Sequence, residues 1–126
     1  MKLLVATVLA AIALSGPALA DGDVAAGKKA FRKCQACHTA EADGKNKVGP
    51  SLHGVYGEPA GRNAKYKYSK AFQEKVAEGL VWTEENLDSW LQDPQAFIKK
   101  AKMVLKLRKP EERANVIAYL KSQGAD

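Results

Sequence analysis

The stretch Lys33–His38, KCQACH, places two cysteines three residues apart and a histidine directly after the second. Three kinds of chemistry use such a pattern: a disulfide, a dithiol redox centre, and covalent haem attachment with the histidine on the iron. A bridge between Cys34 and Cys37 closes a very small loop and stabilises little. A dithiol oxidoreductase needs alternating strands and helices around the pair, and no such pattern is present. The motif therefore predicts haem attachment through Cys34 and Cys37, with His38 as an iron ligand.

Residues 1–20, MKLLVATVLAAIALSGPALA, form a distinct amino-terminal segment. One positive charge at Lys2 precedes an uncharged apolar run that ends in small residues. This arrangement is typical of a secretory signal peptide with cleavage after Ala20. A membrane anchor is the alternative, but the run is short, and Gly16 and Pro17 interrupt it. We therefore expect an exported, periplasmic chain of residues 21–126 that folds as one small domain and has no stable membrane insertion.

The chain is basic, with 20 Lys and Arg against 14 Asp and Glu. Loss of Lys2 leaves 19 against 14, a net charge of +5. Such a balance favours acidic proteins, anionic membrane surfaces or nucleic acid as partners. Export argues against nucleic acid, and so does the lack of a platform of interleaved aromatic and basic residues.

A six-coordinate haem iron needs a second axial ligand besides His38, and few residues can supply it. Once Met1 is removed, Met103 is the only methionine, and His53 is the only other histidine. Met103 lies among lysines in a polar stretch, which suits a ligand-presenting loop better than a core position. His53 is better suited to bracing its own loop through hydrogen bonds. We predict Met103 as the ligand, with His53 and a five-coordinate iron as the alternatives.

The rest of the chain predicts an all-α domain of about four short helices and long loops, without convincing strands. Asp23, Ser69 and Thr83 suit helix N-caps, and Pro110 suits a first helical position. The expected helices run from residue 23 to about 33, from 69 to 79, from 83 to 93 and from 110 to 124. Residues 39–68 are rich in glycine and predict a long loop, and loops of this length usually wrap a ligand.

The order of these parts resembles a known family. After the CxxCH motif come GPSLHG at 49–54, VWT at 81–83, the lysine-flanked Met103 and NVIAYLK at 115–121. Together they resemble the class I cytochromes c, and specifically the small soluble cytochromes c2 of bacteria, which are close to mitochondrial cytochrome c. The resemblance covers residues 22–123. It implies the class I cytochrome c fold, in which short helices and long loops surround one covalently bound haem c.

The resemblance also implies roles for single residues. Cys34 and Cys37 would form the thioether bonds, while His38 and Met103 would be the axial ligands. The carbonyl of Pro50 would accept a hydrogen bond from His38 and so orient the imidazole. The other positions it implies are Tyr68 and Trp82 as donors to a haem propionate, and Gly27, Phe31 and Tyr119 at the crossing of the first and last helices.

Three positions depart from the family pattern. Glu58 stands where relatives often have a basic residue near a propionate, and Arg62 is a candidate to compensate. Ala101 replaces a common threonine two residues before the methionine, and Leu105 replaces an aromatic residue two after it. Each change can loosen the methionine loop or alter the reduction potential, and none removes a ligand.

With both axial positions filled, no open site remains for a substrate, so we expect a one-electron carrier and not an enzyme. The resemblance implies donors and acceptors such as a cytochrome bc1 complex, a photosynthetic reaction centre or a terminal oxidase. A peroxidase-like haem enzyme or a small-ligand sensor with an open iron site is the alternative. We expect a monomer that docks transiently on acidic faces of its redox partners. The lysines expected to dock there are Lys33, Lys45, Lys47, Lys99, Lys100, Lys102 and Lys106.

Overall fold

The computed structural model describes residues 21–124, and the expected signal peptide with its cleavage after Ala20 lies outside them. The helices are α1 (Val24–Ala30), the 3₁₀ helix η1 (Phe31–Lys33), α2 (Lys70–Ala77), α3 (Glu84–Gln92), α4 (Pro94–Phe97) and α5 (Pro110–Ser122). Between residues 21 and 124 there is no strand, only an isolated bridge that joins Pro59 and Val81, so the predicted all-α class is confirmed. No helix in this range has the length and apolar character to cross a bilayer.

Side-chain caps start three helices at the residues that the sequence predicts. Asp23, Ser69 and Thr83 each accept the backbone N–H three residues further on, and Pro110 lies in the first turn of α5. Helix α4 was not predicted. Asp93 ends α3 and also caps this new turn with its carboxylate, so the chain makes a second short helix where a stop signal predicts a loop.

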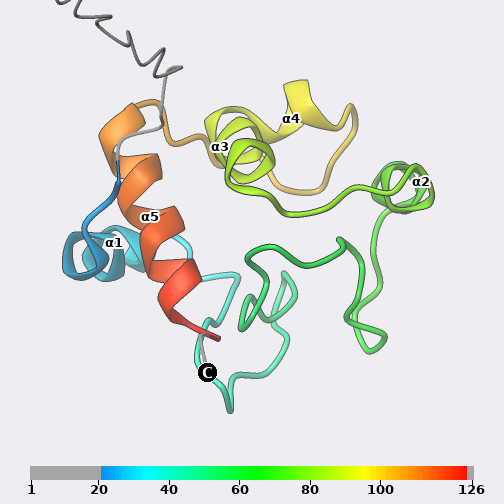
Figure 1. Ribbon diagram of the computed structural model, residues 1–126. Coiled ribbons are helices and arrows are strands. Elements are labelled where there is room, and N and C mark those ends of the chain that lie inside the picture. Colours follow the sequence, from blue (N-terminus) through cyan, green and yellow to red (C-terminus); the bar gives the residue numbers. More distant parts are fainter. Residues whose placement is uncertain (1–20, 125–126) are drawn as a thin grey trace, which may run out of the picture.

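Helices α1 and α5, from opposite ends of the domain, pack across each other (Figure 1). Gly27 is buried at their crossing. A side chain at this position would overlap the carbonyl of Asn115 and bring its Cβ to 2.9 Å from Cβ of Tyr119. The rings of Phe31 and Tyr119 lie beside the crossing with centroids 5.3 Å apart. The expected contact between the first and last helices is therefore confirmed.

Helix α3 also packs on α5, and a buried arginine joins the two. Arg113 Nε donates to Asp88 at 2.7 Å, and its Nη1 donates to the carbonyls of Leu107 and Arg108. This arginine binds α3, α5 and the chain that enters α5. It therefore fixes where the segment after α4 returns to the core.

Residues 39–69 run as a long loop from the end of the CxxCH turn to α2, which lies on the far side of the molecule from α1 (Figure 1). Two asparagines hold this loop together. Asn46 and Asn63 exchange amide hydrogen bonds of 2.7 and 3.3 Å, and Asn46 also accepts the N–H of Ser51 at 2.8 Å. The loop is thus ordered by its own polar contacts around the space that it encloses.

Candidate functional site

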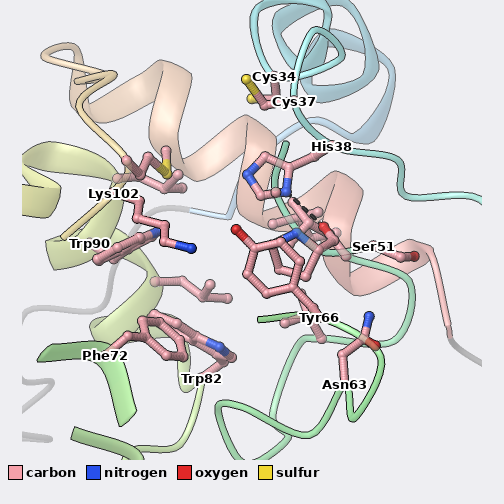
Figure 2. Close-up of a pocket in the computed structure, with 18 of the residues that line it drawn as sticks. Cys34, Cys37, His38, Ser51, Asn63, Tyr66, Phe72, Trp82, Trp90 and Lys102 are labelled. Atoms are coloured by element: carbon pink, nitrogen blue, oxygen red, sulfur yellow. Dashed lines mark hydrogen bonds between the residues drawn. The ribbon is translucent and has the colours of Figure 1, made fainter. Parts of the chain in front are cut away.

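A cavity of about 640 Å³ lies between the long loop, helices α2 and α3, and the segment that leads into α5. Most of its lining is apolar. Phe72, Trp82 and Trp90 form one wall, opposite the end that carries the cysteines (Figure 2). The ring centroids of Trp82 lie 6.1 Å from Phe72 and 5.7 Å from Trp90. This lining suits a large, mostly apolar ligand with few polar anchors.

The CxxCH motif forms the other end of the cavity. Cys34 and Cys37 lie side by side next to His38 (Figure 2), and neither is in a disulfide. Nδ1 of His38 lies 2.7 Å from the carbonyl oxygen of Pro50, so it donates to that oxygen and leaves Nε2 unprotonated and able to bind a metal. Gly49 lies so close to the imidazole that any side chain at this position would overlap the ring. The ring is thus held in one orientation.

Burial changes the acid–base properties of both ends of this motif. It lowers the pKa of His38 below its ordinary value, although the hydrogen bond to Pro50 acts in the opposite direction. Burial, followed by the charge of Glu112, raises the pKa of the Cys34 thiol to about 11. The imidazole is therefore neutral at ordinary pH, which is the state that binds a metal.

Met103 lines the cavity from the segment between α4 and α5 and is half-buried. His53 also lines it, from the long loop. The His53 ring, however, places Nδ1 at 3.1 Å from the carbonyl oxygen of Ala40. One ring nitrogen of His53 thus braces its loop, whereas the Met103 thioether packs against the apolar core and makes no hydrogen bond within the described chain.

Tyr68 and Trp82 supply polar groups at the cavity wall. The Tyr68 hydroxyl accepts the N–H of Asn63 at 3.3 Å, so its own proton stays available for donation. Burial raises the pKa of Tyr68, which keeps this proton in place at ordinary pH. Across residues 21–124, the indole N–H of Trp82 donates to no protein group. Both are therefore available to an acidic group inside the cavity.

The sequence suggests that Arg62 replaces the basic residue that relatives often have at the position of Glu58. The structure places these two residues differently. Arg62 lines the cavity and donates to the carbonyl of His53 at 2.7 Å. Glu58 is exposed and is not part of the lining. A basic residue thus does reach the cavity, from a position four residues later in the chain.

The seven predicted docking lysines are all exposed, but only two of them, Lys33 and Lys102, line the cavity. Lys33 pairs with Glu112, and Lys102 donates to the carbonyl of Lys67 at 2.9 Å while lying over the ring of Tyr66. The remaining five lie outside the lining, in the long loop and in the segment around Met103: Lys45, Lys47, Lys99, Lys100 and Lys106.

The structure also brings residues to the site that carry no signal in the sequence. Gln95 contacts the backbone of Met103, and the pair Asn46 and Asn63 supports the loop beside His38. A lone glutamine or asparagine fits no motif, so its partner appears only in three dimensions. Gly49 could have been found, because it opens the GPSLHG stretch directly before Pro50.

One cavity thus gathers two thiols, a neutral imidazole, a thioether, an aromatic wall and available N–H and O–H donors, which fits a covalently attached haem. Comparison with known proteins supports this fit, because the sequence model of the family described as Cytochrome c matches residues 24–124. The chain belongs to the cytochrome c family. This chain accordingly holds one covalently attached haem c with its iron.

Within the cytochrome c family, the chain is similar to cytochromes c2. It is 49% identical to cytochrome c2 of Rhodospirillum rubrum, an alignment that covers 94% of this chain and 95% of the relative. It is 48% identical to cytochrome c2 of Agrobacterium tumefaciens, over 79% of this chain and 91% of the relative. The solved structure of cytochrome c2 from Rhodospirillum centenum superposes with a TM-score of 0.78 at 40% identity, covering 82% of this chain and 100% of that one.

Cytochrome cH from Methylobacterium extorquens is a second similar structure. It has a TM-score of 0.72 at 43% identity and covers 80% of this chain and 99% of that one. These similarities confirm the class I cytochrome c fold that the sequence predicts. They also show that the domain spans almost the whole of its structural relatives.

Proposed function

We propose that this cytochrome is a one-electron carrier in which Cys34 and Cys37 would hold haem c through thioether bonds and His38 and Met103 would ligate its iron. The haem, when bound, supplies an iron that cycles between two oxidation states. The observation that carries the proposal is the shared cavity, since Met103 is far in sequence from Cys34, Cys37 and His38 and lines the same space. Two protein ligands leave no position for a substrate, which favours a carrier over an enzyme.

The protein's own groups tune this site in three ways. The Pro50 carbonyl orients His38 and raises the basicity of its free nitrogen. The soft sulfur of Met103 favours the ferrous state and so raises the reduction potential. Tyr68 and Trp82, whose donors are available at the cavity wall, are proposed to bind a haem propionate. Each of these contacts limits rearrangement when an electron arrives or leaves.

Partner docking is proposed to use the cavity mouth and its lysines. Val48 and Val104 line the cavity and are 76% and 72% exposed, so apolar surface lies at its edge. Lys33 and Lys106 are partly neutralised by Glu112 and Asp93. Within the described chain Lys45, Lys99 and Lys100 pair with no acidic group, so they carry the charge that is fully available to an acidic partner.

The amino-terminal segment and the similarity to cytochromes c2 support the proposed setting. Cleavage after Ala20 would release residues 21–126 into a periplasm. There the protein would carry electrons as a monomer between membrane redox complexes, such as a cytochrome bc1 complex and a photosynthetic reaction centre or terminal oxidase. The same lysine-bordered cavity mouth would serve donor and acceptor in turn, because each contact must be brief.

An absorption spectrum of the oxidised protein tests the proposal. We expect the weak long-wavelength band that arises from charge transfer between methionine sulfur and ferric iron. It should vanish in Met103→Ala and persist in His53→Ala, the control that removes the rival ligand. A parent protein that lacks the band and binds carbon monoxide readily when reduced would have an open sixth position, and a peroxidase-like enzyme or a ligand sensor would then replace the carrier.

A further inference from the structure

The segment that presents Met103 is held firmly at its two ends. Ile98 before it and Leu107 after it are 1% and 2% exposed. The N–H of Ala101 donates to the carbonyl of Ile98 at 3.0 Å, and the N–H of Leu107 donates to Leu91 at 2.8 Å. Between these anchors, the chain from Lys102 to Lys106 runs along the surface without a helix or strand.

One side chain reaches the middle of this segment. Nε2 of Gln95 donates to the carbonyl oxygen of Met103 at 3.0 Å and also to that of Ala101. A side-chain amide has two N–H hydrogens, so it can serve both carbonyls at once. Within residues 21–124, no other side chain donates to the backbone of residues 99–106. The backbone of the proposed ligand thus depends on a single glutamine.

Gln95 is itself held in place by α4. This single turn starts at the buried Pro94, and Asp93 caps it. The N–H of Ile98 donates to the carbonyl of Pro94 at 2.9 Å and closes the turn. Asp93 also pairs with Lys106 at 3.2 Å, so the same turn contacts the segment at both of its halves. Because the backbone of α4 is held in place, the Gln95 side chain loses little conformational entropy when its amide donates to the two carbonyls.

We propose that Gln95 is a positioning residue that clamps the Met103 segment and so sets how readily the sixth iron position opens. This inference rests on the proposed role of Met103 as the second axial ligand. The segment opens by local unfolding, in which the anchors at Ile98 and Leu107 stay packed and the chain between them leaves the cavity. Loss of both Gln95 hydrogen bonds raises the population of this open state by about tenfold or more.

Imidazole competition on the oxidised holoprotein measures this opening directly. Added imidazole takes the sixth position only when Met103 has left it, and the loss of the sulfur-to-iron band follows the exchange. We expect about tenfold tighter apparent imidazole binding in Gln95→Ala. Gln95→Glu keeps the side-chain length but has no donor, so it should show the same change or a larger one. Gln92→Glu adds the same charge at an exposed position three residues earlier and should match the parent.

A second measurement separates the clamp from general stability. Urea unfolding followed by far-UV circular dichroism reports the whole fold, and we expect Gln95→Glu to change imidazole affinity more than the global unfolding constant. Gln95→Asn keeps the amide group on a side chain that is one methylene group shorter. This variant replaces Gln95→Ala in the imidazole measurement if Gln95→Ala fails to fold.

Three outcomes would overturn the clamp. Imidazole affinity that is unchanged in all Gln95 variants shows that the amide does not restrain the segment. A change no larger than the loss of global stability assigns Gln95 an ordinary structural role. A parent protein without the sulfur-to-iron band refutes the proposed function first, and the clamp with it, so the two failures are told apart before any Gln95 variant is made.

Discussion

At the scale of single residues, the close approach of α1 to α5 depends on the absence of a side chain at Gly27. Gly27→Ala should destabilise the protein by about 3 kcal/mol or more, because the new methyl group overlaps the Asn115 carbonyl and forces α1 away from α5. Urea unfolding of the holoprotein measures this loss. Lys28→Ala, at an exposed position on the same helix, is the control and should stay within about 0.5 kcal/mol of the parent. Equal stability of Gly27→Ala and the parent would show that the helix crossing adapts.

Some residues of the candidate site can be predicted from a sequence motif, whereas others are recognised only from their contacts in the folded structure. Cys34, Cys37 and His38 are predictable because the CxxCH spacing is characteristic of haem attachment. Met103 is predictable as the second ligand because the chain offers few other candidates. Gln95 was not predictable. Its partners are backbone carbonyls six and eight residues away, and any residue type presents such carbonyls, so no sequence pattern marks the pair.

At the scale of elements, three helix starts were predictable because Asp23, Ser69 and Thr83 each satisfy a backbone N–H locally. Helix α4 was not, since its four residues are too few to show a period and Pro94 equally suits a loop or a first turn. The glycines of residues 39–68 predict the long loop. Its internal order, which depends on the Asn46 and Asn63 amides meeting across the loop, could not be derived from composition.

Helix α4 should respond to acid through Asp93. Partial burial acts to raise the pKa of this carboxyl, but the hydrogen bonds from Lys106 and Ala96 outweigh it and hold the pKa below its ordinary value. A carboxyl with a depressed folded-state pKa stabilises the fold above its unfolded-state pKa, and this stabilisation is lost as pH falls through the folded-state pKa. Asp93→Asn keeps a cap acceptor but has no charge. We therefore expect the parent to be more stable than the variant at about pH 7 and this difference to shrink below about pH 4.

Urea unfolding midpoints of the two proteins across this pH range test the acid response. The difference between them is the quantity to follow, because other carboxyls titrate alike in both. A difference that stays constant as pH falls would mean that the Asp93 charge does not support α4.

At the scale of the whole molecule, the apolar cavity contributes to the core and the basic surface contributes to the proposed partner docking. The domain is small, so an apolar group that fills the cavity supplies much of the core that the short helices cannot form alone. The acidic residues of α3 and the pairs Lys33 with Glu112 and Lys106 with Asp93 neutralise part of the surface. In the proposed docking, the lysines of the long loop and of the Met103 segment that are unpaired in the described chain would meet an acidic partner.

Docking should therefore weaken as the salt concentration rises. It should also depend more on where the lysines lie than on the net charge of the protein. The rate of electron exchange with a membrane redox complex should fall as ionic strength rises. Reversing Lys45 and Lys99 to glutamate should lower this rate about tenfold at low ionic strength and weaken its salt dependence, because both lysines lack an internal acidic partner. Reversing Lys28 and Lys29, which are exposed on α1 and belong neither to the long loop nor to the Met103 segment, changes the net charge equally and should have a much smaller effect. If the two double variants slow exchange to the same extent, net charge alone steers the encounter, and the lysine surface around the cavity loses its special role.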